Sequence, residues 1–382
     1  MTEWREYKLK ELADFNPDSL TAKNKLEFIN YLDTGNITKG KIDTIQYLNL
    51  LTDKVPSRAK RIVKKNDIVY STVRPNQEHY GIIKNPVDNM IVSTGFVVLR
   101  SKEDKCYSDF LYYFLTLPEN TEYLSNVAED STTAYPSITP DVIMDMDISL
   151  PPLPEQKAIA EVLSSLDDKI DLLTRQNKTL EDLAQAYFRK WFIEDASDEW
   201  EVGKLGDYIE IHDSKRVPLS KIEREKMKSG TLYPYYGAAT IMDYVNDYIF
   251  DGEYILMGED GTVETEDGYP ILQYATGKFW VNNHAHVLTA KSPFNNYFIW
   301  FFLKQCNISG IVTGAVQPKI NQENLKNIDI PIPDLTLINS ANQFFANIFA
   351  KILNNLEQIK TFQKLRDTLL PKLISGEIRV KM

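Results

Sequence analysis

The amino-acid sequence predicts an α+β fold in which two similar globular domains are separated by a pair of long antiparallel coiled-coil helices. Three observations predict it: an internal repeat, short strand-like runs that end at a proline-rich junction in each copy, and a heptad pattern after each junction. The 382 residues are enough for two domains of ordinary size. We expect the first globular domain at 1–150, its junction and helix at 151–195, the second domain at 196–333, and the last junction and helix at 334–382.

Short motifs recur in the same order in the two halves of the chain, which predicts a pseudo-twofold internal repeat. The clearest matches are Glu3-Trp4 with Glu199-Trp200, Tyr135-Pro136-Ser137-Ile138 with Gln317-Pro318-Lys319-Ile320, and Asp147-Ile148 with Asp329-Ile330. The sequence offset between the two copies of a motif becomes gradually smaller along the chain. Diverged duplicates that differ in loop length would show this drift.

Each copy begins with runs of Val, Ile, Tyr and Phe between Gly, Pro and Asn residues, a pattern typical of β-strands. The runs are Asp67–Thr72 and Ile91–Leu99 in the first copy, and Tyr254–Met257 and Phe279–Leu288 in the second. A proline-rich junction follows in each copy, at 150–154 and 330–333. Because proline has a fixed φ and no N–H, we expect it to stop the preceding strand and start a new element.

The segment from Glu155 to about Phe192 lacks Pro and Gly, and its apolar residues recur with the alternating spacing of four and three that defines a coiled-coil seam. The predicted seam consists of Ile159, Leu163, Leu166, Ile170, Leu173, Leu180 and, in the second helix, Phe345, Ile348, Ile352, Ile359, Phe362 and Leu369. Asn177 lies within the seam of the first helix, while Asn355 and Arg366 interrupt the two seam rows of the second helix. Polar residues at such positions often set register and orientation.

Helices of this length extend roughly 55–60 Å at 1.5 Å per residue, which is longer than either globular domain is wide. If the domains are related by a pseudo-twofold axis, the second helix runs back towards the first domain. We therefore expect an antiparallel pair that keeps the two domains apart. The alternative is two ordinary amphipathic core helices.

The composition is that of a globular protein, with 43% hydrophobic and 25% charged residues. No apolar stretch is long enough to span a membrane, and the first residues do not resemble a secretory signal. The two cysteines, Cys106 and Cys306, fit buried thiols in a reduced compartment, so we expect a cytoplasmic protein. The net charge of −11 opposes DNA binding, unless a basic face or a basic partner supplies the phosphate contacts.

Sequence motifs for catalysis are missing. The chain has neither a phosphate-binding Walker loop nor a dinucleotide-binding glycine motif, and its four histidines and two cysteines do not form a zinc pattern. His284 and His286 would share a face of a strand, where a structural or DNA-contacting role is favoured over metal ligation. The acidic cluster Glu259, Asp260, Glu264, Glu266 and Asp267 leaves open a self-sufficient metal-dependent nuclease, although an acidic loop is favoured. A coiled-coil scaffold that does not bind DNA is a third possibility.

Features of nucleic-acid binding are better supported. A basic run without acids is followed by side chains of the types that contact base edges, and the second copy offers Lys, Arg and Tyr. The predicted DNA-contacting residues are Lys54, Arg58, Lys60, Arg61, Lys64, Lys65, Thr72, Arg74, Asn76, Gln77, His79, Tyr80, Lys215, Arg216, Tyr235 and Tyr236. The alternatives are a solvated charge run for the lysines and core positions for the tyrosines.

Several motifs together resemble the specificity subunits of type I restriction-modification systems. They include Tyr233-Pro-Tyr-Tyr-Gly-Ala-Ala-Thr, Gly277-Lys-Phe-Trp-Val-Asn-Asn-His-Ala-His-Val-Leu, Gln317-Pro-Lys-Ile-Asn, Leu153-Pro-Glu-Gln-Lys-Ala-Ile-Ala and Leu373-Ile-Ser-Gly-Glu-Ile-Arg. They span nearly the whole chain. One departure is the second junction, Leu335-Thr-Leu-Ile-Asn, which lacks the usual Glu-Gln pair and so puts in doubt its contacts with a partner.

The resemblance implies that each globular region is a target-recognition domain that reads one half of a split double-stranded DNA site. The helices would set the unread spacer and dock modification (methyltransferase) subunits. Restriction subunits with translocase and nuclease activity would complete the complex. S-adenosylmethionine, ATP and Mg²⁺ would then belong to the partner subunits, and this chain would hold no cofactor and no catalytic site.

Overall fold

The computed structural model describes residues 4–21, 23–131, 135–314 and 317–381, so Glu3 of the first repeated motif lies outside the described residues. The chain divides into two compact units, one formed by Met1–Leu172 with Ile359–Met382 and one by Leu173–Gln358. Each unit holds one globular region and a stretch of each long helix. None of the helices in the described ranges is long and apolar enough to cross a membrane.

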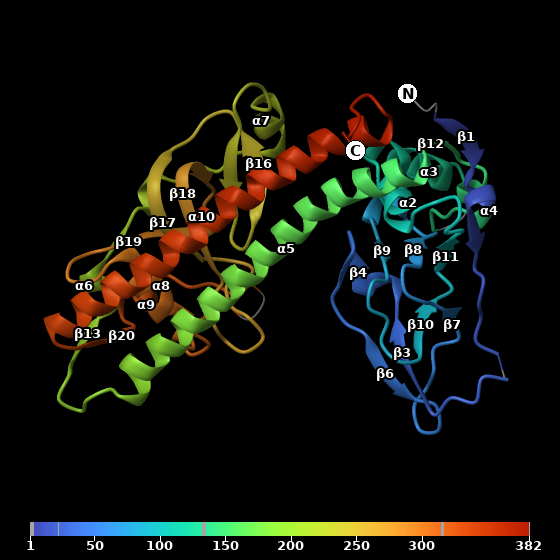
Figure 1. The fold of residues 1–382 in the computed structure, drawn as a ribbon. Coiled ribbons are helices and arrows are strands. Elements are labelled where there is room, and N and C mark those ends of the chain that lie inside the picture. The colour runs from blue at the N-terminus through green and yellow to red at the C-terminus, as the bar shows by residue number, and fades with distance from the viewer. Residues whose placement is uncertain (1–3, 22, 132–134, 315–316, 382) are drawn as a thin grey trace. The chain divides into compact units, whose positions relative to one another are not determined.

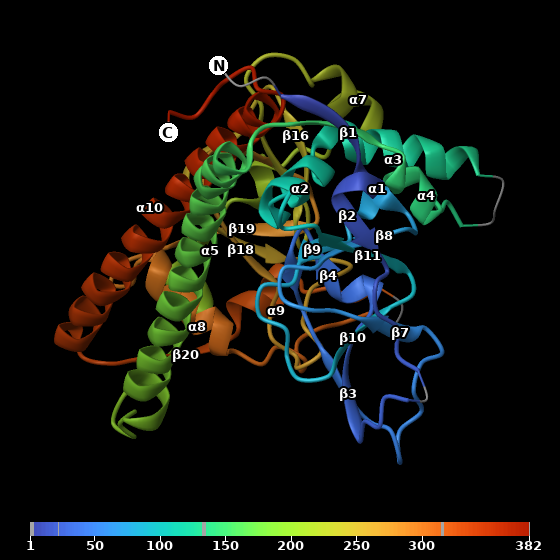
Figure 2. The same ribbon diagram turned by 45° about the vertical axis from the view of Figure 1, so that its right-hand side comes forward.

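The globular region of the first unit is built on two four-stranded sheets (Figure 1). In strand order they are β6 (Gln46–Asn49), β3 (Phe28–Leu32), β10 (Met90–Ser93), β7 (Ala59–Ile62), and β2 (Ala13–Phe15), β11 (Phe96–Ser101), β8 (Ile68–Ser71), β9 (Tyr80–Ile82). Smaller antiparallel pairs are β1 (Arg5–Lys8) with β12 (Asp147–Leu150), and β4 (Ile37–Thr38) with β5 (Lys41–Ile42). The helices are α1 (Leu9–Leu12), α2 (Ser108–Leu115), α3 (Pro118–Asp130) and α4 (Pro140–Met144), which lie beside β8 and β11 (Figure 2) and share a core with them.

The globular region of the second unit has one six-stranded sheet. Its order is β14 (Ile209–Ile211), β19 (Ala285–Ala290), β17 (Phe250–Gly258), β18 (Leu272–Val281), β15 (Tyr233–Tyr236), β16 (Ile241–Val245). A separate pair joins β13 (Glu201–Lys204) to β20 (Asp329–Ile332). The helices are α6 (Leu205–Tyr208), α7 (Lys221–Lys226), α8 (Asn296–Gln305) and α9 (Gln322–Lys326), and α8 packs its aromatic face on β17 and β19.

The two regions share one strand plan, which confirms the internal repeat. In both, one strand pairs in parallel with an earlier strand: β10 with β3, and β18 with β15. The next strand along the chain then pairs antiparallel with another earlier strand: β11 with β8, and β19 with β17. The single strand β18 corresponds to β9 and β10 of the first unit, where the strand is broken. The predicted strands 91–99 and 279–288 each cover parts of two strands, because turns at 94–95 and 282–284 interrupt them.

One repeated contact shows how closely the copies agree. The Lys8 Nζ donates to the Asp145 backbone oxygen at 2.8 Å and pairs with Asp147 at 2.6 Å. Its counterpart Lys204 donates to the Asn327 backbone oxygen at 3.1 Å and pairs with Asp329 at 2.5 Å. In each copy the lysine ties the first strand of the region to the last, so each region is closed by its own ends.

The long helices are α5 (Leu153–Arg189), continued by a π-helical turn at Lys190–Glu194, and α10 (Leu335–Ile374). Within each unit their segments run side by side in opposite directions (Figures 1 and 2). In the first unit Leu163 shares a core with Leu370, and in the second Phe188 packs on Phe345 with ring centroids 5.8 Å apart. The antiparallel pairing is therefore confirmed in each unit.

The predicted seam positions are all buried or half-buried. Ile159, Leu163, Ile170, Leu173, Phe345, Ile348 and Ile352 are buried, and Leu166, Leu180, Ile359, Phe362 and Leu369 are half-buried. At the end of α5, Tyr187, which is seven residues after the seam residue Leu180, is exposed while Phe188 is buried. An α-helix with 3.6 residues per turn drifts relative to a strict seven-residue repeat, so the buried face moves on by one residue.

The polar residues of the seam pair with one another. Asn355 Nδ2 donates to Asn177 Oδ1 at 2.8 Å, and Asn177 Nδ2 reaches the Ile352 backbone oxygen at 3.4 Å. Within the described residues, the buried Asn355 Oδ1 has no hydrogen-bond partner. In the first unit Arg366 binds Asp167 at 2.9 Å. The seam thus offers each polar side chain a partner at only one alignment of the two helices.

The Glu-Gln pair of the first junction has an internal role. Both side chains are buried: Gln156 joins the backbones of Lys105, Tyr107 and Pro151, and Glu155 forms an ion pair with Arg379. In the second junction Leu337 and Ile338 stand at the matching positions and join the apolar core of that unit. The departure noted in the sequence therefore concerns how each junction packs within its own unit.

Candidate nucleic-acid interface

The basic run of the first unit lies on and around the edge strand β7. Lys54, Arg58, Lys60 and Lys65 are exposed, and the described residues provide no ion pair for them. Lys64 is already bound to Asp18 at 3.0 Å, and Arg61 is half-buried, which lowers the pKa of its guanidinium. Four of the six predicted cations are thus free to meet phosphates.

The segment after β8 forms a tight 3-10 turn at Pro75–Gln77. Arg74, Asn76 and Gln77 are exposed on it, and both Arg74 (φ 48°) and Glu78 (φ 57°) adopt the left-handed conformation. Thr72 is half-buried and its hydroxyl donates to the Gly95 backbone oxygen at 2.9 Å, so it holds the turn. His79 Nδ1 lies 2.7 Å from the Ile37 backbone oxygen.

A cavity of about 250 Å³ opens beside this turn. Its walls come from the turn, from helix α3 and from the segment before α4, and comprise Arg74, Pro75, Asn76, Gln77, Ser125, Ala128, Glu129 and Pro136. The Arg74 guanidinium also lies over the Tyr135 ring, 5.7 Å from its centroid. Sequence reasoning missed Glu129 and Ser125, because nothing in the local sequence of α3 shows that it packs against this turn.

Three residues predicted to contact DNA are engaged within the protein instead: Tyr80 and Tyr235 are buried, and Arg216 is half-buried. Tyr80 is stacked on Tyr70, and burial raises the pKa of its phenol. The hydroxyl of Tyr235 accepts the Leu219 N–H at 2.9 Å inside the second unit. Arg216 is half-buried, forms an ion pair with Glu259 and donates to the Ala285 backbone oxygen at 2.6 Å. These three side chains therefore contribute to packing and hydrogen bonding within the protein.

The remaining predicted residues of the second unit lie differently. Lys215 is exposed, whereas Tyr236 is half-buried against the Phe279 ring. A neighbouring surface group escaped sequence reasoning: Lys278 lies 4.3 Å from the centroid of the Tyr248 ring, and Tyr233 packs on the same ring. Tyr233 is on β15, Lys278 is on β18 and Tyr248 lies in the loop before β17, so their sequence separation hid the group.

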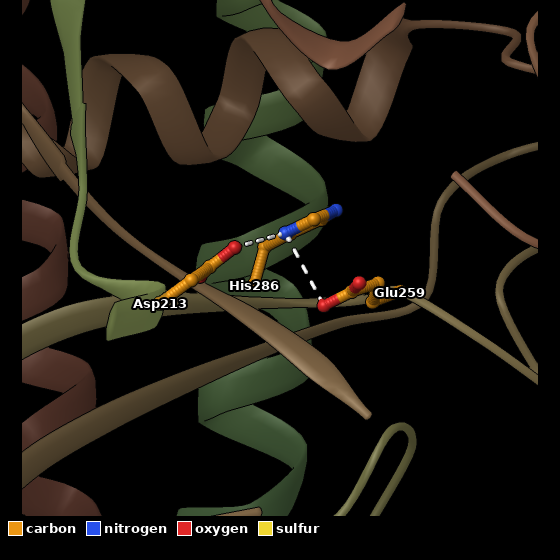
Figure 3. A group of neighbouring side chains, drawn as sticks. All are labelled: Asp213, Glu259 and His286. Atoms are coloured by element: carbon orange, nitrogen blue, oxygen red, sulfur yellow. Dashed lines mark hydrogen bonds and ion pairs between the residues drawn. The ribbon is translucent and has the colours of Figure 1, made fainter. Parts of the chain in front are cut away.

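A group of charged residues, with Asp213 and His286 buried and Glu259 half-buried, meets where the loop that follows β17 begins (Figure 3). His286 Nδ1 lies 2.6 Å from Asp213 and 3.7 Å from Glu259, while its Nε2 lies 2.9 Å from the Ile320 backbone oxygen. Both ring nitrogens thus lie within hydrogen-bond distance of oxygen atoms. Burial raises the pKa of Asp213, but the hydrogen bond and charge of His286 outweigh it and lower that pKa overall.

These three residues have the composition of a metal site, but their lone pairs already meet donors. Asp213 accepts from the Val287 N–H at 2.9 Å and from Gln322 at 2.7 Å. Glu259 accepts from Arg216 at 2.5 Å and pairs with Lys319 at 3.4 Å. The arrangement is chemically suited to clamp the loop through ion pairs and does not offer free ligand atoms.

The histidine pair and the acidic cluster do not form one site. His284 lies in the turn before β19 and contacts Asp260, whereas His286 is on the strand and fully buried, so they do not share a face. Glu264 accepts from the Ser309 hydroxyl at 2.9 Å, and Glu266 and Asp267 are exposed at the loop tip. Within the described residues, the acids of this cluster therefore contact separate partners and do not gather into one site.

Comparison with known proteins identifies the class. The family model described as "Type I restriction modification DNA specificity domain" matches twice, at residues 1–182 and 197–368. The chain is 34% identical to the HindI specificity subunit of Haemophilus influenzae over 58% of this chain and 48% of that subunit. It is 28% identical to the MjaIX specificity subunit of Methanocaldococcus jannaschii over 99% of this chain and 94% of that one.

A solved structure has the same fold. The type I restriction-modification S subunit from M. genitalium superposes with a TM-score of 0.61 at 17% identity, over 99% of this chain and 96% of that one. The two family matches coincide with the two structural copies.

Proposed function

Because this chain belongs to the family of type I restriction-modification DNA specificity subunits, we propose that its two globular regions each read one half of a split double-stranded DNA site. The chain is the non-catalytic, sequence-recognising subunit of its system. The observation that carries the proposal is the structural duplication, since each unit closes on itself through the Lys8 or the Lys204 contact and presents its own exposed loops.

We further propose that modification and restriction subunits dock on the long helices. Large apolar side chains remain exposed on both: Leu172, Leu183 and Tyr187 on α5, and Leu335, Leu356 and Leu365 on α10. Exposed apolar groups in such number on a helix surface favour a protein partner. Those partners would carry S-adenosylmethionine, ATP and Mg²⁺, and the net charge of −11 implies that they also supply part of the phosphate contacts. A cytoplasmic location fits access to DNA.

A domain exchange tests the assignment. Residues 1–150 are replaced by the equivalent region of another family member, and the methylated sequence of a host that expresses the chimera with its modification subunit is determined. We expect one half of the bipartite sequence to change and the other to stay. The corresponding exchange of residues 196–333 is the matched control and should change the other half of the sequence. A chimera that alters both halves together would contradict the proposal.

A further inference from the structure

The turn at Arg74 has a structural counterpart in the second unit. The Arg74 N–H donates to the Pro136 backbone oxygen at 2.9 Å, and the Gly261 N–H donates to the Pro318 backbone oxygen at 3.0 Å. Ile138 and Ile320 make the next matching bonds, to the backbone oxygens of Thr72 and Glu259 at 2.9 and 2.8 Å. Arg74 and Gly261 therefore occupy the same position of the repeat.

Both residues adopt the left-handed conformation, with φ of 48° at Arg74 and 80° at Gly261. A Cβ added to Gly261 would meet no atom within 4 Å. Glycine is therefore favoured at this position by the backbone angle and not by a lack of space for a side chain. An arginine at this position bears steric strain that the other copy avoids. Strain of this kind persists at functional sites, where the side chain is needed.

The Arg74 side chain is placed to contact a ligand. It is exposed, and the described residues hold no hydrogen-bond acceptor or carboxylate on its guanidinium, which lies over the Tyr135 ring. It shares the cavity wall with Glu129 on α3. An acid beside the arginine disfavours a phosphate oxyanion, whereas a G·C pair offers two acceptors to an arginine and one amino donor to a carboxylate.

We propose that Arg74 is a specificity-determining residue that reads the guanine of one G·C pair in the first half-site, with Glu129 accepting from the paired cytosine. The proposal rests on the proposed function. The second copy, with glycine at this position, reads its half-site without such a contact.

The test is selection from a DNA library randomised in both half-sites, with the full chain in complex with its modification subunit. R74G should lose the guanine preference at one position of the first half-site, by roughly 5- to 150-fold against the other bases. R74K should weaken it, because a lysine ammonium lacks the planar fork of two nitrogens that matches the two guanine acceptors. E129Q should weaken selection at the same base pair, and the second half-site should stay unchanged in each variant.

Two controls separate the side chain from the backbone. R74G relieves a strained residue, so its thermal midpoint should not fall below that of the wild type. E78G relieves the neighbouring left-handed residue of the same turn and should keep the wild-type sequence preference. An unchanged preference in R74G, or its loss in E78G, would overturn the assignment. A wild-type complex that selects no bipartite sequence would instead refute the proposed function.

Discussion

The buried Asn177–Asn355 pair provides a quantitative test of the helix seam. In the single variants N177L and N355L, the asparagine that remains is still buried but loses the hydrogen bond of 2.8 Å to its partner. A buried polar group without a partner costs about 1–3 kcal/mol. In the double variant N177L/N355L no stranded amide is left, and the unpaired Asn355 Oδ1 of the wild type is removed as well.

We therefore expect the double variant to be more stable than either single variant, by about 1–3 kcal/mol. For a unit of this size, that difference corresponds to roughly 2–12 °C in thermal midpoint. Calorimetry or circular dichroism of all four proteins in a double-mutant cycle measures it. N354L is the matched control, because Asn354 is an exposed neighbour on the same helix and its replacement should change the midpoint little. If the single variants were as stable as the double variant, the two amides would not be coupled and the reasoning would fail.

Three further predictions concern DNA binding, the group of charged residues around Asp213 and the helices. Replacing Arg58, Lys60 and Lys65 by alanine should weaken binding of the complex to all sequences and reduce the slope of log K against log salt by about 0.9 for each lost phosphate contact, whereas K64A alone should change it less because Lys64 is bound to Asp18. D213N should destabilise the second unit by up to about 3–5 kcal/mol, because it removes the carboxylate nearest to the buried His286 and leaves only Glu259 to balance its charge and that of Arg216. Since the pKa of Asp213 is lowered in the folded state, its ionised form stabilises the protein above the ordinary aspartate pKa of about 3.9, so the difference between wild type and D213N in pH-dependent unfolding should shrink as the pH falls below that value. Inserting one heptad in register into both α5 and α10 should lengthen the unread DNA spacer by roughly three base pairs, because seven residues add about 10 Å, and selection from libraries of randomised spacer length would contradict this if the preferred spacer stayed the same.

The duplicated plan and the helix seam could be predicted from the amino-acid sequence because both are written in local patterns. A heptad row needs only the spacing of residues such as Leu163 and Ile170, and a repeat needs only the order of motifs. The backbone periodicity of a helix then decides which residues share a face. The exposure of Asn76 and Gln77, whose side chains are of the types that contact DNA bases, could also be predicted, because they follow a strand and a proline that starts a turn.

Only the tertiary structure decided which of the candidate DNA-contacting side chains are exposed and which residues they contact. Arg216 and Tyr235 have the residue types of an interface, yet Arg216 is bound to Glu259, and Tyr235 is buried and bound to Leu219. Arg74 adopts its left-handed angle in a turn bonded to Pro136, and Glu129 lines the same cavity because α3 packs on the turn. Burial, hydrogen-bond partners and strained backbone angles depend on residues brought together by the fold, so a pattern read along one stretch of chain does not contain them.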